Sequence, residues 1–344
     1  MSPYQNCVLC PRRCGVNREA GECGYCGETS ELRIAFAGIH RGEEPPVTGE
    51  GGSGTVFITG CSLGCVFCQN YQVSQKGFGR VVSTAEFAGI CLALQEKGAE
   101  NLNIVTGSHA APALVKGIEA AKIRGLIIPV LWNSSGYDGL ETLEILKDVV
   151  DVYLPDLKTL DSAIAAGFSN APDYPEHACA AILKMMEFRE LRFACKPALS
   201  EAPALPVSGP AAQPQAGDKM LSGVMIRHLI LPGFLENTRQ VLRWFTQNCS
   251  GASGCRALLS LMTQYTPVVP PGTNGRFSGK TIPERFLSED EYDEVMLMLE
   301  EFGIEDGFCQ EPVTGSDWLP DFTRPNPFSS KLSVPVWHCG SVYE

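Results

Sequence analysis

The sequence predicts an α/β protein built on a largely parallel sheet. From residue 54 onward, short β-branched or apolar runs alternate with longer helical patterns, which is typical of successive β/α units. The chain has 344 residues, of which 44% are hydrophobic and 19% charged. This length and composition suffice for roughly two domains, or for one large α/β barrel with appendages, and they exclude a disordered chain.

Six strands and six helices account for this alternation. Strands are expected near 55–59, 102–106, 126–132, 149–154, 224–231 and 257–265, and helices near 84–97, 111–124, 140–147, 175–186, 235–247 and 288–302. Ser83 or Thr84 caps the first helix, with Glu86 in its opening turn. Residues 199–219 are rich in Pro, Ala and Gly, which predicts a flexible insertion. Six parallel strands make an incomplete barrel or an open sheet.

Charge and hydropathy narrow the class of protein. The chain has 27 basic and 39 acidic residues, a net charge of −12, which argues against a nucleic-acid partner. No apolar run approaches the roughly 18 residues that a bilayer span needs. The first residues lack the apolar core of a secretory signal. We therefore expect a cytoplasmic protein without membrane contact.

Cysteine usage is the outlying feature of the composition. Of 15 cysteines, eight lie in the first 68 residues. One group has the spacing C-x2-C-x3-C-x8-C-x2-C and comprises Cys7, Cys10, Cys14, Cys23 and Cys26. A second group, C-x3-C-x2-C, comprises Cys61, Cys65 and Cys68. A reducing cytosol disfavours stable disulfides, so these groups indicate metal or redox chemistry, whereas the other seven cysteines are expected to be ordinary buried or incidental thiols.

The second cysteine group predicts an iron–sulfur cluster with one open corner. A cubane cluster has four irons, and thiolates usually hold all four. Three cysteines in one loop leave an iron free for substrate or cofactor, as a catalytic zinc keeps one open position. The loop follows the first predicted strand directly, and the carboxyl ends of parallel strands are where α/β folds place their active sites. A three-Cys zinc site with a distant fourth ligand, or free thiols, are the alternatives.

The motifs around this loop carry a family resemblance. In order along the chain they are GCSLGCVFCQNY, NIVTGSH, LWNSSGY, DVYLPDLK, IRHLILPG and SLMTQYTP. Together they resemble the radical S-adenosylmethionine (SAM) superfamily, and within it the family related to pyruvate formate-lyase activating enzymes. The resemblance implies a partial (β/α)6 barrel at residues 51–270, interrupted by the insertion. A Cys-rich metal-binding segment at 1–50 precedes the barrel, and a helical and irregular extension at 271–344 follows it.

The resemblance also implies roles for individual residues. Cys61, Cys65 and Cys68 would hold a [4Fe-4S] cluster whose fourth iron is chelated by SAM, and Phe67 would pack against the adenine. The other implied cofactor-binding residues are Thr106, Gly107, Ser108, Asn133, Ser134, Ser135, Asp156, Lys158 and Arg227. The family's Gly-Gly-Glu and Asp-Thr-Asn-Gly segments are replaced here by Thr106-Gly107-Ser108-His109 and Asn133-Ser134-Ser135-Gly136. Both replacements lack the family's carboxylate, so backbone carbonyls or hydroxyls are expected to receive the SAM amino group.

The N-terminal cysteines predict a second metal site. Four thiolates on turns suit a tetrahedral sulfur site, for zinc or for a second iron–sulfur cluster. The resemblance favours Cys7, Cys10, Cys14 and Cys26 as ligands and leaves Cys23 spare. The segment could have a structural role, in which it covers the mouth of the barrel. The alternative is that its metal site relays electrons.

The function expected is therefore that of a radical SAM oxidoreductase. The enzyme would cleave SAM reductively to a 5′-deoxyadenosyl radical that abstracts a hydrogen atom, with a flavodoxin or ferredoxin as external electron donor. The resemblance suggests a glycyl-radical enzyme as the protein substrate. The alternatives are radical modification of another protein, peptide or small molecule, and, from another class, a non-enzymatic iron–sulfur electron-transfer or zinc protein.

Overall fold

The structure, a computed structural model, describes most of the chain. Its described residues are 2–194, 207–208, 218–251, 254–268, 276–277, 280–281, 283–305, 307–312, 315 and 318–340. The predicted insertion at 199–219 lies outside the described residues, except for positions 207–208 and 218–219.

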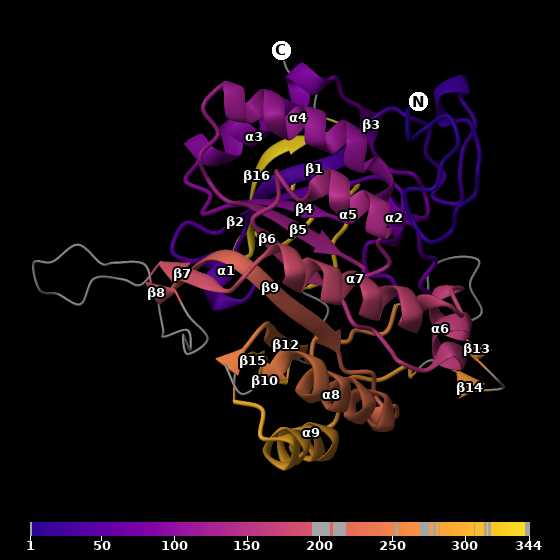
Figure 1. Cartoon of the computed structure of the whole chain (residues 1–344), viewed down its shortest axis with the longest axis vertical. Coiled ribbons are helices and arrows are strands. Elements are labelled where there is room, and N and C mark those ends of the chain that lie inside the picture. Colours follow the sequence, from indigo (N-terminus) through magenta and orange to yellow (C-terminus); the bar gives the residue numbers. More distant parts are fainter. Residues whose placement is uncertain are drawn as a thin grey trace, which may run out of the picture.

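Six parallel strands form the centre of the sheet, which confirms the predicted fold class (Figure 1). In spatial order they are β2 (Ser53–Ile58), β4 (Leu102–Val105), β5 (Val130–Ser134), β6 (Val152–Pro155), β9 (Lys219–Leu229) and β12 (Leu258–Met262). Each overlaps a predicted strand, with bounds that differ by up to five residues. The register places Val56 opposite Ile104 and Trp132 opposite Tyr153. These strands are buried almost throughout, as parallel strands between other layers must be.

Three further strands extend the sheet at its two ends. β1 (Arg33–His40) pairs antiparallel with β2, and β16 (Ser333–His338) pairs antiparallel with β1. At the opposite end, β15 (Gly307–Cys309) pairs parallel with β12. The sequence analysis did not predict these strands. β1 lies within residues 1–50, so part of the predicted Cys-rich segment belongs to the sheet.

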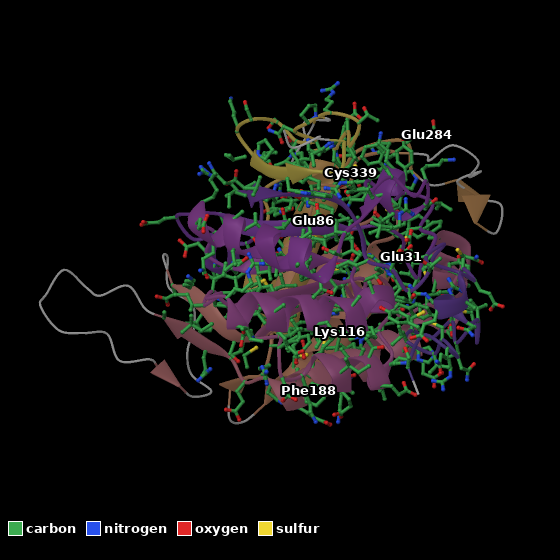
Figure 2. The ribbon with its side chains drawn as sticks, turned by 90° about the horizontal axis from the view of Figure 1, so that it is seen from above. Glu31, Glu86, Lys116, Phe188, Glu284 and Cys339 are labelled. Carbon is green, nitrogen blue, oxygen red and sulfur yellow. The ribbon has the colours of Figure 1, made fainter. Side chains whose placement is uncertain are left out.

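Helices connect the strands and cover the sheet. They are α3 (Thr84–Glu96), α4 (Ala111–Ile123), α5 (Leu140–Leu146), α6 (Ser162–Ser169), α7 (Tyr174–Phe188), α8 (Leu235–Cys249) and α9 (Glu289–Phe302). Ser83 caps α3 by accepting a hydrogen bond from Glu86 N, and Ser288 forms a capping box with Glu291 at α9. Glu86 of α3, Lys116 of α4 and Phe188 of α7 follow one another down one side of the molecule (Figure 2).

Short elements complete the described chain. They are η1 (Arg18–Ala20), α1 (Pro45–Thr48), α2 (Tyr71–Ser74), β3 (Arg80–Val81), η2 (Ser108–Ala110), β7 (Arg192–Ala194), β8 (Val207–Ser208), β10 (Ser250–Gly251), β11 (Gly254–Cys255), β13 (Arg276–Phe277) and β14 (Lys280–Thr281). None of the helices formed by the described residues is both long and apolar enough to cross a membrane.

The loop between β1 and β2 closes one end of the barrel. Because β1 runs antiparallel to β2, its last residue lies near the amino ends of the parallel strands. The loop then forms α1, whose Val47 is buried with apolar side chains of the parallel strands, among them Leu131 and Leu154. This burial fixes the loop inside the barrel, opposite the end at which the three-cysteine loop lies.

Candidate functional site

All six parallel strands contribute side chains to one cavity of about 270 Å³ at their carboxyl ends. Its lining includes Cys61 after β2, Thr106 after β4, Asn133, Ser134 and Ser135 of β5 and its following loop, Asp156 and Lys158 after β6, Arg227 of β9 and Gln264 after β12. Convergence of polar groups at the carboxyl ends of parallel strands is the usual plan of α/β active sites.

The cluster loop, residues 59–70, forms one wall of this cavity. Cys61, Cys65 and Cys68 all line it. Leu63 N donates to Cys61 Sγ over 3.3 Å. The other two thiols each contact a hydroxyl at 3.3 Å, Cys65 that of Ser169 and Cys68 that of Ser74. Three thiols from one loop therefore face the same space, with local polar partners that orient them.

Thiol ionisation in this wall is resisted by burial and assisted by a cation. Burial raises the pKa of Cys61 and, to about 11, that of Cys68. The Cys65 thiol next to both adds to the rise, whereas Lys158 lowers both values. Thiolates in this environment need positive charge, and bound iron is the kind of charge that deprotonates a thiol outright.

Lys158 and Asp156 form an ion pair on the adjacent wall, with Nζ and Oδ2 2.5 Å apart. Burial by itself lowers the pKa of Lys158, but Asp156, Cys65 and Tyr174 together outweigh this and raise it. The hydroxyl of buried Tyr174 lies 3.0 Å from Lys158 N and 2.8 Å from the carbonyl oxygen of Asp156. Tyr174 therefore fixes the backbone that carries the pair, as a support behind a binding site should.

Thr106 stands in an unusual backbone conformation at the cavity wall. Its φ is +60°, which is rare for a β-branched residue. Thr106 N donates to the carbonyl oxygen of Asn133 over 2.8 Å, so the first residue after β4 continues the pairing with β5. Strained residues held by their surroundings cluster at functional sites. The Thr106 side chain is thereby set into the cavity.

Gly107 and Ser108 lie behind the wall rather than in the lining. A Cβ at Gly107 would stand 2.6 Å from the Trp132 ring, so the glycine serves packing between β4 and β5. Ser108 Oγ donates to Asp138 Oδ1 over 2.6 Å, and Ser134 Oγ donates to Asp138 Oδ2 over 2.5 Å. Asp138, which is buried and whose pKa is raised by burial, thus ties the two polar loops together. The sequence analysis did not single out Asp138.

Aromatic rings close the side of the cavity next to the cluster loop. Phe67 lines the cavity and meets Phe168 and Tyr265 edge to face, with ring centroids 6.1 Å apart in both pairs. Tyr265 is buried and donates to the carbonyl oxygen of Pro283. One face of Phe67 therefore has aromatic support, which suits a ring that packs against a planar ligand.

Arg227 lies beneath these groups between two carboxylates of the β1–β2 loop. Its Nη2 is 3.2 Å from Glu43 Oε2, and its Nε is 3.1 Å from Glu44 Oε1. Burial alone lowers the pKa of Arg227, whereas Glu44 and Glu43 together raise it. We call Glu43, Glu44 and Arg227 the acid floor. Neither glutamate was found from the sequence, because the loop has no periodicity; its only signal is a Glu-Glu pair before two prolines.

Two further cavity-lining groups come from segments that the sequence analysis did not connect with the site. His40 is the last residue of β1, and Trp318, Pro320 and Phe328 belong to the chain between β15 and β16. His109, the last residue of the segment that replaces the family's Gly-Gly-Glu, is buried, and its Nε2 lies 2.7 Å from the carbonyl oxygen of Thr59. His109 therefore lies behind the cluster loop.

Four of the N-terminal cysteines lie near one another. Burial raises the pKa of the Cys10 thiol to about 12, and the thiols of Cys26, Cys7 and Cys14 add to the rise. A Cβ at Gly24 would lie 2.9 Å from Cys14 Sγ and 3.8 Å from Cys26 Sγ, so these two thiols flank one glycine. Cys23 is exposed and takes no part in these contacts.

Arginines attach the N-terminal segment to the barrel. Buried Arg18 donates to the carbonyl oxygen of His109 over 2.6 Å and to Cys7 Sγ over 3.7 Å. Arg12 donates to the carbonyl oxygen of Ser62 in the cluster loop over 2.9 Å, and its guanidinium lies 3.9 Å from the centroid of the Tyr25 ring. The segment therefore packs directly behind the three cavity thiols.

Among the described residues, no three His, Cys, Asp or Glu side chains stand close enough together to hold a single metal ion. Cluster ligands stand farther apart than the ligands of one ion, because irons and sulfides lie between them. The cluster loop fits the larger group, since its three thiols line one open wall. The ligand set of the N-terminal site stays a prediction.

This combination defines a class of protein: an α/β enzyme with a three-thiol loop at the carboxyl ends of a six-stranded parallel sheet. Residues 55–190 match the family model of the Radical SAM superfamily. That range contains the cluster loop and runs from β2 to the end of α7. This part of the chain, about two fifths of it, is therefore a radical SAM domain. The superfamily's cofactors are a [4Fe-4S] cluster and SAM, which confirms the cofactors expected from the sequence.

Individual relatives are distant. An uncharacterized protein of Methanocaldococcus jannaschii is 26% identical over 316 residues, covering 88% of this chain and 76% of its own. Streptococcus suis SuiB, solved with its precursor peptide SuiA, has a TM-score of 0.45 at 12% identity, covering 73% of this chain. This chain spans 46% of SuiB. A domain of pyruvate-formate lyase-activating enzyme from Bacteroides vulgatus has a TM-score of 0.36 at 12% identity. The match covers 58% of this chain and 91% of that domain. The assignment of residues 55–190 to the radical SAM superfamily rests on the family model.

Proposed function

We propose that the chain binds a [4Fe-4S] cluster through Cys61, Cys65 and Cys68, and SAM beside it, and abstracts a hydrogen atom from a substrate in the same cavity. When bound, the reduced cluster supplies the electron that cleaves SAM to methionine and a 5′-deoxyadenosyl radical. The observation that carries the proposal is the position of these thiols on one wall of the cavity, next to Lys158 and the polar strand ends.

The lining residues bind and orient SAM. Lys158 is a partly buried cation, which suits the SAM carboxylate, and Asp156 holds its Nζ in place. The carboxylate that the family places after the second strand is absent here, so the hydroxyl of Thr106 and the side-chain oxygen of Asn133 are the groups offered to the SAM amino group. Phe67, supported by Phe168 and Tyr265, packs against the adenine.

The protein also encloses the cavity in which the radical would form. A carbon radical reacts with stray hydrogen donors, so the cavity must exclude them. Phe57 of β2 and Phe328 of the chain before β16 both line the cavity, with ring centroids 5.6 Å apart. Part of the cavity wall is therefore apolar.

Anaerobic reconstitution with iron and sulfide, followed by reduction in the presence of SAM, tests the proposal. The expected product is 5′-deoxyadenosine, measured by chromatography and mass spectrometry, and its formation should require reductant. Absence of the product from protein with a full complement of cluster iron would overturn the proposal.

Activation of a glycyl-radical enzyme is the second candidate, favoured by the six ordered motifs shared with activating enzymes. It predicts that reconstituted protein, SAM and reductant generate the electron paramagnetic resonance doublet of a glycyl radical on the partner. If 5′-deoxyadenosine formed while the partner protein gained no glycyl radical, this candidate would be excluded, but the proposed cleavage of SAM would stand.

Two associated proposals concern electrons and metal. We infer that a flavodoxin or ferredoxin delivers the electron, which predicts that reduced flavodoxin replaces dithionite in the assay.

We also infer that Cys7, Cys10, Cys14 and Cys26 hold zinc or a second cluster. Replacing Cys10 with Ala should then remove that metal, whose identity elemental analysis gives, while the iron of the cluster loop stays.

A further inference from the structure

The cavity has a floor with a chemistry of its own. The β1–β2 loop reaches the barrel interior from the amino ends of the strands, so Glu43 meets the cavity from the side opposite the cluster loop. Asn103 Nδ2 of β4 donates to Glu43 Oε1 over 3.2 Å, and Ser260 Oγ of β12 donates to Glu44 Oε1 over 2.6 Å. Both carboxylates are thus held by strands on opposite sides of the barrel.

The acid floor and its neighbours carry more negative than positive charge. The described carboxylates here are Glu43, Glu44 and Asp156, and the described cations are Arg227 and Lys158. The Glu43 and Glu44 side chains are only 8% and 4% exposed. Glu44 Oε2 is buried and has no hydrogen-bond partner among the described residues. His40, which also lines the cavity, adds no charge at neutral pH, because burial lowers its pKa to about 4.

A buried, unbalanced carboxylate requires a proton or a cation, since an isolated ion in a protein interior is strongly destabilised. The cofactors do not provide that cation. Three thiolates and an oxidised cubane core together carry a single negative charge, and SAM, with its ammonium, sulfonium and carboxylate, carries a single positive one. Their charges cancel, so they do not neutralise the acid floor. Burial, with Glu44 adding to it, raises the pKa of Glu43, so this carboxyl holds a proton more readily until a cationic group of the substrate takes its place.

Aromatic groups surround the same end of the cavity. A Cβ at Gly42 would lie 3.1 Å from the Trp318 ring and 2.9 Å from His40 Nε2, so this glycine lets both rings approach the backbone next to Glu43. The His40 and Phe328 rings are 4.9 Å apart. Carboxylates next to aromatic rings form the usual surroundings of a bound ammonium group, which gains from both. His40 Nδ1 is a buried polar atom with no partner among the described residues and offers a further hydrogen bond.

The chain between β15 and β16 limits the size of this ligand. β15 and β16 lie at opposite ends of the sheet, so the segment joining them passes across the side of the barrel that the sheet leaves open. Gln72 of α2 holds this crossing segment, donating to Asp321 Oδ1 over 3.2 Å and accepting from Phe322 N over 2.7 Å. Phe322 is fully buried, and its carbonyl oxygen lies 3.0 Å from His338 Nε2 of β16. A folded partner would have to displace this anchored segment.

Resting on the proposed function, we propose that the substrate is a small molecule with an ammonium group, which Glu43 binds at the floor of the cavity while Trp318 covers it. The cofactors occupy the cluster-loop side, and the crossing segment held by Gln72 covers the floor side, which favours a small substrate over a folded partner.

Calorimetry on the full-length, anaerobically reconstituted protein with SAM and without reductant tests this assignment. The probes are n-butylammonium, n-butanol and butyrate, which share size and differ in charge. We expect butylammonium to bind at least about tenfold more tightly than either other probe, as a charge-assisted hydrogen bond allows. Equal binding of the three probes, or no binding, would overturn the proposal.

Variants test whether Glu43 is the source of the preference for butylammonium. Glu43→Gln should abolish this preference, whereas Glu144→Gln, the same change at an exposed residue of α5, should retain it. Trp318→Ala should weaken butylammonium binding about threefold, with partial rescue by Trp318→Phe. Circular dichroism melting identifies a Glu43→Gln chain that fails to fold, in which case the Trp318 pair decides: equal affinities in wild type and both Trp318 variants would count against the site.

A long lysine-containing peptide forms the last arm. If the peptide bound more tightly than butylammonium, the proposal of a small substrate would be wrong, although the preference for an ammonium group would stand. Because no reductant is present, the outcome is separate from SAM cleavage. A charge preference without 5′-deoxyadenosine formation in the reductive assay would refute the proposed function alone, whereas cleavage without the preference would refute this inference alone.

Discussion

The two sides of the cavity are built in different ways. The cluster loop takes its three thiols from eight consecutive residues, and only part of its support, such as Ser169 of α6, comes from distant chain. The acid floor is assembled from the β1–β2 loop and from β9, and the aromatic cover above it comes from the far end of the chain. The thiols of the cofactor side therefore form a local motif, whereas every part of the substrate side depends on the whole fold.

The largest effect should follow from Cys65→Ala, which removes the middle thiol of the cluster loop. A cubane held by two thiolates is not retained, so SAM cleavage should fall more than about a hundredfold, together with cluster iron. Cys179→Ala, a thiol on α7 away from the cavity, is the matched control and should keep both. Full activity in Cys65→Ala would contradict the ligand assignment.

On the acid floor, the main effect of Arg227→Met should be a loss of folding stability. It leaves Glu43 and Glu44 buried without their cation, which costs about 3–5 kcal/mol of unfolding free energy. Denaturant titration measures this, and adding Glu44→Gln should recover part of the loss. If Arg227→Met were neutral, the two carboxylates would not be held by ion pairing, and the charge count on the floor would be wrong.

Acid should weaken the β6–β9 side of the barrel that carries Arg227. Burial lowers the pKa of neighbouring His228 to about 4, against an unfolded value of about 6.5. The unfolded chain therefore takes up a proton first as the pH falls. The contribution of His228 is complete above pH about 6.5 and is lost towards pH about 4, an effect on the order of 3 kcal/mol. His228→Gln should flatten this part of the stability profile, and an unchanged slope would exclude His228 as its source.

On the cofactor side, Lys158→Gln should weaken SAM binding by about 10-fold to 100-fold, because a charged hydrogen bond to the carboxylate is lost. Equilibrium binding to reconstituted protein measures the effect. Combining it with Asp156→Asn removes the unpaired carboxylate that Lys158→Gln leaves, so the double variant should fold more stably than the single one without regaining affinity. Unchanged affinity in Lys158→Gln would place the SAM carboxylate elsewhere.

The smallest effect is expected at the exposed ion pair between Arg13 and Glu141, which joins the N-terminal segment to α5. Both side chains are more than half exposed, so Glu141→Gln should change the unfolding free energy by less than about 1 kcal/mol. A loss several times larger in thermal unfolding would mean that this contact, rather than buried Arg18, attaches the segment.

The same contrast explains what the sequence could predict. The six parallel strands were found because each is a short apolar run between helical patterns, and the cluster loop was found because its spacing is local. β1 was missed because RIAFAGIH, apolar almost throughout, follows the cysteine-rich turns without any alternation. Glu43 and Trp318 come to line the same cavity only after the chain has gone around the barrel, and no short-range pattern encodes such a placement. Asp138 was missed for a related reason, since its role depends on two loops being adjacent.

Electron paramagnetic resonance of the reduced, reconstituted protein tests the central claim most directly, by comparing spectra with and without SAM. An iron left free by Cys61, Cys65 and Cys68 should be bound by SAM, so we predict that SAM changes the g-values of the cluster signal and that a neutral SAM-sized nucleoside does not. Identical spectra with and without SAM would contradict the account, because the three-thiol loop would then have no open iron for SAM to occupy.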